Sequence, residues 1–125
     1  MTEAAIDAAA FARLVEMTGG EIEFVDELVD TYLEDGANQL AALRAAVAAG
    51  SSDELVRPAH SLKSSSLNVG ALGLGAQCRE LEEGARSGDV PDAASRVDAI
   101  AAGFDDVRRE LLAERDGRTG GRTAS

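Results

Sequence analysis

The residue best suited to chemistry in this sequence is its one histidine, His60. The unperturbed pKa of an imidazole is about 6.5, so at pH 7 a large fraction is neutral and carries a nucleophilic ring nitrogen. On a helix, Arg57, Lys63 and Ser64 lie three or four residues from His60 and share its face. An imidazole beside two positive side chains is suited to attack on phosphorus, because positive charge offsets the charge of the arriving phosphoryl group.

The helix that carries His60 is predicted to begin at Ser51, because Ser51 and Glu54 have the spacing of a capping box. It is predicted to end near residues 68–70, where Asn-Val-Gly forms a plausible C-terminal cap. Pro58 removes a backbone donor inside this segment and therefore predicts a kink or a fresh helix start just before His60.

The stripe of small and apolar residues on this helix places His60 at its edge. We therefore expect the imidazole to be exposed, with Val56 and Leu67 forming an apolar rim around it. If the ring were buried among core side chains, an incoming phosphoryl donor would not reach it.

The remaining segments also have helical periodicity. The sequence predicts helices over residues 5–17, 21–49, 71–86 and from Pro91 to about Arg115. Gly36 lies inside the long second helix and is expected to weaken it locally. Four amphipathic helices with short loops predict an all-α fold, an antiparallel four-helix bundle with a short additional N-terminal helix. Residues 1–115 form this domain, and residues 116–125 are predicted to be a disordered tail.

Composition excludes several classes of function. With 12 basic and 23 acidic residues the net charge is −11, which disfavours nucleic acid as a partner. No apolar run is long enough to cross a membrane, and no signal peptide is evident. Cys78 is the single cysteine and is expected to be an inert core residue, which fits a cytoplasmic protein. No metal-ligand set and no nucleotide-binding glycine motif can be assembled.

Several segments together resemble the histidine-containing phosphotransfer (HPt) domain family. The signature of that family, approximately A-H-x-L-K-G-S, stands here at residues 59–65 as AHSLKSS, and a Gly-Ala turn follows at residues 70–71. The next helix has the family's apolar-x-x-x-Cys-x-x-Leu-Glu pattern, formed by Leu74, Cys78, Leu81 and Glu82. Residues 24–33 of the long helix predicted over residues 21–49 are also similar to the family's second helix. The resemblance covers about residues 5–113.

The resemblance implies a phosphorelay intermediate that is not an enzyme in its own right and has no ATP-dependent kinase activity. His60 would accept a phosphoryl group from the phospho-aspartate of a response-regulator receiver domain, or from a histidine kinase, and pass it to another receiver. Lys63 would stabilise the phosphoryl group, and Ser64 would be the small neighbour where the family usually has Gly. The receiver would supply Mg²⁺, so no cofactor is expected here, and the protein is expected to be a monomer.

Some roles stay open at this stage. Antiparallel pairing through Gly70 brings Arg79 and Glu82 roughly level with His60, and either can be a supporting contact. A lone histidine is more often structural or simply solvent-exposed, and only the surrounding pattern favours a phosphoacceptor. The alternative function is a non-transferring helical adaptor that binds and sequesters a response regulator, with His60 incidental.

Overall fold

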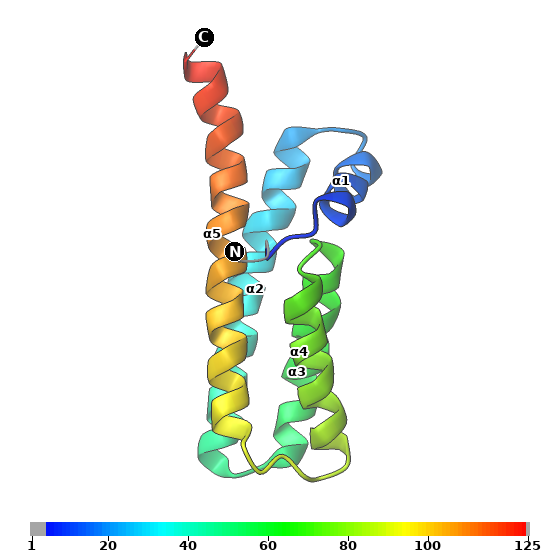
Figure 1. Cartoon of the computed structure of the whole chain (residues 1–125), viewed down its shortest axis with the longest axis vertical. Helices are drawn as coiled ribbons and strands as arrows, with labels where there is room; N and C mark the ends of the chain where they lie inside the picture. Colours follow the sequence, from blue (N-terminus) through cyan, green and yellow to red (C-terminus); the bar gives the residue numbers. More distant parts are fainter. Residues whose placement is uncertain (1–4, 125) are drawn as a thin grey trace.

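Helices account for nearly all of the structure, a computed structural model that describes the backbone of residues 5–124 and the side chains of residues 5–114. The helices are α1 (Ala8–Met17), α2 (Ile22–Ala49), α3 (Ser52–Asn68), α4 (Leu72–Arg86) and α5 (Ala93–Ala124). Helices α2 to α5 run alternately up and down the long axis of the molecule (Figure 1). The predicted all-α antiparallel four-helix bundle with an additional N-terminal helix is therefore confirmed.

The ends of the helices follow the capping signals in the sequence. The Ser51 hydroxyl accepts a hydrogen bond from the Glu54 amide at 3.3 Å, so α3 begins where the capping box predicts. Gly50 ends α2 with a φ of 65°, and Gly70 turns the chain between α3 and α4 with a φ of 87°. Both angles lie in the left-handed region that glycine adopts without strain.

Helix α3 continues through Pro58 without interruption. Of the two alternatives predicted at this proline, the fresh helix start is therefore wrong, and the kink stays a prediction. Proline costs the helix the hydrogen bond to the Glu54 carbonyl, but burial of its ring and the packing of α3 in the bundle offset that loss. His60 thus lies in the middle of one continuous helix.

The core lies between the four long helices and is mainly aliphatic. Its largest fully buried side chains are Leu43, Leu55, Leu62, Leu81, Ile100, Val25, Val97, Val107, Cys78 and Ser66. The Ser66 hydroxyl on α3 is hydrogen-bonded to the Tyr32 hydroxyl on α2 at 2.8 Å, so these two buried polar groups satisfy each other. Burial raises the pKa of Tyr32 to about 12. Cys78 is a core residue as predicted, and burial raises the pKa of its thiol to about 12.

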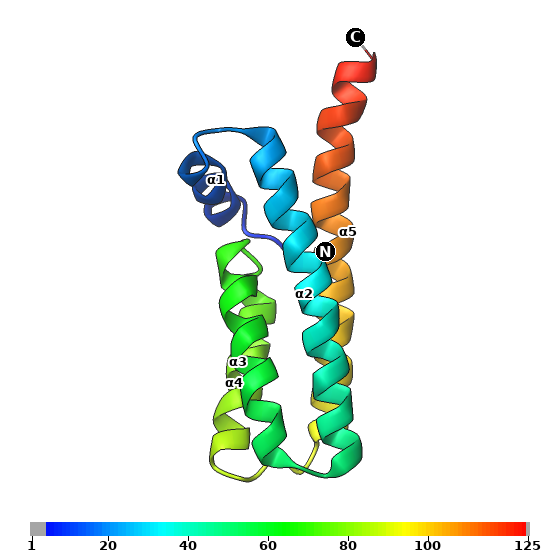
Figure 2. The same ribbon diagram turned by 180° about the vertical axis from the view of Figure 1, so that it is seen from behind.

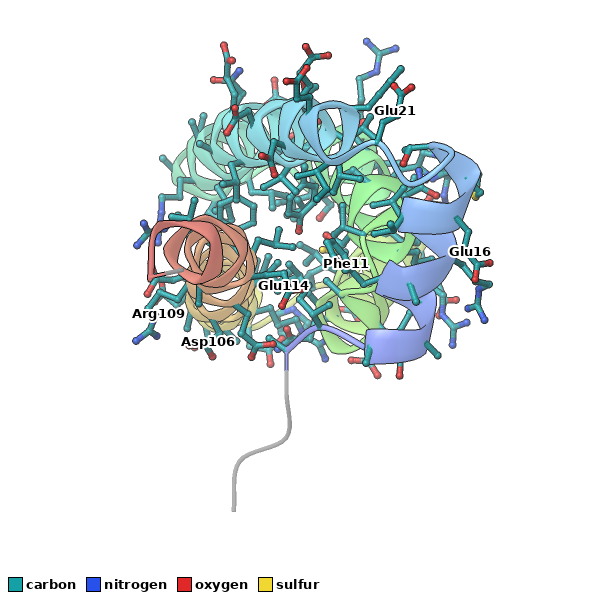
Figure 3. The ribbon with its side chains drawn as sticks, turned by 90° about the horizontal axis from the view of Figure 1, so that it is seen from above. Phe11, Glu16, Glu21, Asp106, Arg109 and Glu114 are labelled. Carbon is teal, nitrogen blue, oxygen red and sulfur yellow. The ribbon has the colours of Figure 1, made fainter. Side chains whose placement is uncertain are left out.

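Helix α1 lies across the end of the α3–α4 hairpin (Figures 1 and 3). It begins at Ala8 and not at Ala5, because the Asp7 carboxylate caps it by accepting from the Ala10 amide at 2.9 Å. Backbone hydrogen bonds of the residues before α1 attach them to the bundle. The amides of Ala5 and Ile6 donate to the Glu110 carboxylate of α5 at 2.6 and 2.9 Å.

Helix α5 is longer than the sequence predicts. It continues to Ala124, past Arg115, and its last turns extend beyond the neighbouring end of α2 (Figure 2). The prediction of a disordered tail at residues 116–125 is corrected for the backbone as far as Ala124. Extending an existing helix fixes one residue for each new hydrogen bond, and this segment contains no proline to stop it. The division of the chain into domain and tail at residue 115 stays a prediction.

Gly36 allows α2 and α5 to approach each other closely. It is buried, and a Cβ atom built on it would overlap the ring of Phe104, which packs against Tyr32 with ring centroids 5.6 Å apart. Helix α2 is continuous through Gly36, and Phe104 fills the space that a side chain would take. The local weakening of α2 expected here stays a prediction.

This contact predicts that Gly36→Ala destabilises the protein, although alanine is ordinarily the better helix former. We expect the free energy of unfolding to fall by about 1–3 kcal/mol, the usual cost of overpacking. The matched control is Gly73→Ala, because a Cβ atom at that exposed position of α4 meets nothing within 4 Å. Urea denaturation followed by far-UV circular dichroism measures both. Equal stability of the two variants would contradict the packing described here.

Candidate functional site

The hairpin of α3 and α4 brings His60 and Glu82 together, although they are 22 residues apart in the sequence. The two helices pack closely where Gly75 of α4 faces Leu67 of α3. A Cβ atom at Gly75 would lie 2.6 Å from Cδ2 of Leu67. The absence of a side chain at this point lets the helices approach, and their register places the middle of α3 beside the last turns of α4.

The centre of the site is the carboxylate of Glu82. Its side chain is only 6% exposed, which is unusual for a glutamate. Oε2 accepts from Nδ1 of His60 at 2.9 Å and from the Arg86 guanidinium, with Nη2 at 2.8 Å and Nε at 3.1 Å. Oε1 accepts from Nζ of Lys63 at 2.8 Å. Three nitrogen-bearing side chains therefore surround one buried negative charge.

The surroundings decide the protonation of Glu82. Burial by itself raises the pKa of this carboxyl, because desolvation penalises the charged form. The hydrogen bonds from Lys63, Arg86 and His60 lower the pKa more than burial raises it, and the result is about 2, against the ordinary 4.5. Glu82 is thus an ionised acceptor at neutral pH.

An ionised carboxylate has no hydrogen to donate, so the hydrogen in the contact between His60 and Glu82 belongs to Nδ1 of the imidazole. In the neutral ring this leaves the lone pair on Nε2. The His60 side chain is 53% exposed, so a partner can reach the ring from solvent. The arrangement holds a nucleophilic nitrogen in one tautomer and orientation at the surface of α3.

A surface depression adjoins the imidazole. It is lined by Val56, Arg57, His60, Ser61 and Arg86. Two of these five residues carry a positive charge, and both arginine side chains belong to exposed residues. The depression therefore offers an approach to His60 that is suited to a negatively charged group.

Comparison with known proteins matches the chain to one family. The Hpt domain family matches residues 27–110, which include the whole of α3 and α4. The crystal structure of histidine-containing phosphotransfer protein B (HptB) from Pseudomonas aeruginosa PAO1 is similar in fold, with a TM-score of 0.84 and 34% sequence identity. The match covers 92% of this chain and 97% of that one. A search among curated proteins finds no match.

The chain belongs to the Hpt domain family. Its function is histidine phosphotransfer in phosphorelay signalling, as the resemblance at residues 59–65 predicts. HPt proteins are phosphotransfer intermediates and not kinases, and they interact with receiver domains and histidine kinases.

The residues predicted from the HPt signature lie around the imidazole in different ways. Lys63 is held against Glu82, with only 21% of its side chain exposed, and so points toward α4. Ser64 is exposed on the same helix, one turn from His60. Val56 is half-buried and lines the depression beside His60, whereas Leu67 is exposed and faces Gly75. The apolar rim around the ring stays a prediction. The roles of Lys63 and Ser64 in phosphotransfer also stay predictions.

The two candidate supporting residues on α4 are separated by the structure. Glu82 contacts His60 directly, whereas Arg79 pairs with Glu83 at 3.7 Å. Arg86 was not predicted, although it lies four residues after Glu82, the spacing at which side chains on one helix face meet. That spacing is the signal in the sequence that identifies it.

Among the described residues, no group of three or more His, Cys, Asp or Glu side chains is placed to hold a metal ion. Within that same part of the chain, no helix is both long and apolar enough to cross a lipid bilayer.

The low pKa of Glu82 predicts a loss of stability in acid. Because the folded-state pKa of about 2 lies below the ordinary 4.5, Glu82 contributes its full stability above pH 4.5 and loses it as the pH falls toward 2. We expect this contribution to be roughly 1–3 kcal/mol, reduced by solvent screening. Urea denaturation of the wild type and Glu82→Gln, at neutral pH and near pH 3, measures it.

The neighbouring Glu83→Gln is the control for this experiment, because Glu83 is an exposed carboxylate on the same helix. Glu82→Gln should be less stable than wild type at neutral pH and lose less on acidification, while Glu83→Gln should behave as wild type. If Glu82→Gln kept the acid dependence of the wild type, the assigned network around the carboxylate would be wrong.

Proposed function

We propose that His60 is the phosphoacceptor of this HPt protein and that the phosphoryl group is carried on Nε2. The observation that supports this assignment most directly is the hydrogen bond from Nδ1 to the ionised Glu82, which leaves Nε2 as the free nucleophile on an exposed ring. His60 is also the one histidine of the chain.

The proposed transfer moves no proton. Nε2 of neutral His60 attacks the phosphorus of a receiver aspartyl phosphate, the new N–P bond forms, and the P–O bond to the aspartate breaks. The aspartate leaves as a carboxylate with the electron pair of that bond. Because Nδ1 keeps its hydrogen, the phosphorylated ring is a cation, and the Glu82 carboxylate at 2.9 Å stabilises it. The return step onto a second receiver reverses these changes and regenerates the neutral imidazole.

Lys63 and Ser64 support this step in different ways. Lys63 places a positive charge one turn from His60, where it stabilises the phosphoryl group by its field and holds the second oxygen of Glu82. Ser64 is exposed and small, and a small side chain at this position lets a receiver approach the imidazole. The rim of Val56 and Leu67 gives that receiver an apolar contact beside the reacting atoms.

The proposal also covers the oligomeric state, cofactor requirement and partners of the protein. We propose that the protein works as a monomer without a cofactor and has no ATP-dependent kinase activity. Its partners are response-regulator receiver domains, which bring the Mg²⁺, and a histidine kinase, with no nucleic acid or membrane partner. A net charge of −11 supports the exclusion of nucleic acid. The cytoplasmic location expected from the single cysteine stays a prediction.

The test of the phosphoacceptor is phosphotransfer from a labelled receiver. We expect the wild type, mixed with a cognate receiver that carries radioactive aspartyl phosphate, to take up phosphate that is acid-labile and alkali-stable. His60→Gln should take up none. Because the His60 side chain is exposed, this variant should keep the helical content of the wild type, which circular dichroism checks.

Two results would contradict the assignment. Label on folded His60→Gln would place the phosphoryl group on another residue. A wild type that binds its cognate receiver but accepts no phosphate would favour the adaptor function over phosphotransfer.

A further inference from the structure

The cations around Glu82 differ in their freedom to move. Lys63 is mostly buried and is bonded to Oε1. The Arg86 side chain is 60% exposed and bonds to Oε2, the same oxygen that His60 uses. Arg86 and the imidazole are therefore neighbours across a single oxygen atom, and Arg86 also lines the depression beside the ring.

Phosphorylation of His60 changes the charge of this cluster. With the imidazole in its neutral, nucleophilic form, Glu82 carries −1 and Lys63 and Arg86 carry +1 each, so the cluster has a net charge of +1. A dianionic phosphoryl group on a ring that keeps its Nδ1 hydrogen adds −2 and +1. The phosphorylated cluster is then neutral, and Arg86 is one of the three positive charges that balance Glu82 and the phosphoryl group.

The same change gives Glu82 a third cationic partner. Once the ring is a cation, the bond from Nδ1 to Oε2 becomes a charge-assisted hydrogen bond between opposite charges. Glu82 then has two cationic partners, Lys63 and the imidazolium, without Arg86. Lys63 is less free to leave, because it is mostly buried and its departure would remove the partner of Oε1.

We propose that Arg86 is a phosphoryl-binding residue that moves from Glu82 to the phosphoryl oxygens when His60 is phosphorylated. This inference deepens the proposed function and rests on His60 as the phosphoacceptor. The phosphoryl group lies in the depression between α3 and α4, where the planar guanidinium can donate two parallel hydrogen bonds to its oxygens. Arg86 thereby stabilises phosphohistidine relative to the aspartyl phosphate of the receiver.

The test is the equilibrium of phosphate between this protein and one cognate receiver. We expect Arg86→Gln to shift that equilibrium toward the receiver by about tenfold, the effect of losing a hydrogen bond to a charged group. Arg86→Lys keeps the charge but not the paired donors and should fall between Arg86→Gln and the wild type. Urea denaturation of each variant shows whether its fold is intact.

Two controls remove the same charge elsewhere. Arg79→Gln removes an arginine of the same helix that pairs with Glu83 and not with Glu82. We expect this variant to have the same phosphate equilibrium as the wild type. Arg57→Gln removes the other arginine of the depression and should shift the equilibrium less than Arg86→Gln. An Arg86→Gln value equal to that of Arg79→Gln, or a larger shift for Arg57→Gln, would overturn the role of Arg86.

The outcome separates this inference from the proposed function. If the wild type carries phosphate on His60 and Arg86→Gln behaves as the wild type, only the role of Arg86 fails. If His60→Gln is also labelled, the phosphoacceptor assignment fails first.

Discussion

The site depends on one buried negative charge. A carboxylate with 6% exposure is unfavourable unless several donors compensate its lost hydration, and Glu82 has donors from both helices of the hairpin. Lys63 and His60 come from α3, and Arg86 comes from α4 itself. Each donor that stabilises the carboxylate also fixes something else: the register of α3 against α4, the position of a cation, or the tautomer of the imidazole.

The rest of the bundle holds α3 so that this contact forms. The buried Tyr32–Ser66 hydrogen bond links α3 to α2, and the missing side chain at Gly75 lets α4 come close. His60 needs no general base, because the neutral ring already has a free lone pair on Nε2. The fold thus contributes orientation and electrostatics to the proposed transfer.

The sequence predicts the bundle and the position of His60 well, because both follow from local signals. The Ser51 cap, the turn at Gly70 and the amphipathic stripes depend on neighbouring residues, and the structure has them where they are expected. The burial of Lys63 against Glu82, and the contact of His60 with Glu82 and not with Arg79, depend on how α4 is rotated against α3. That rotation is set by packing at Gly75 and the core, which helical periodicity does not determine. Helix α3 continues through Pro58 and α2 through Gly36, because tertiary packing outweighs the low helix propensity of both residues.

In the proposed function, Glu82 fixes the hydrogen on Nδ1 and thereby directs phosphorylation to Nε2. Nitrogen-15 NMR of the His60 imidazole, before and after phosphorylation by a receiver, tests this claim directly, because the two ring nitrogens have distinct shifts and phosphorus couplings. We predict an Nδ1–H tautomer in the resting neutral ring and a phosphorus bond to Nε2 afterwards. A resting tautomer with the hydrogen on Nε2, or a phosphoryl group on Nδ1, would contradict the account.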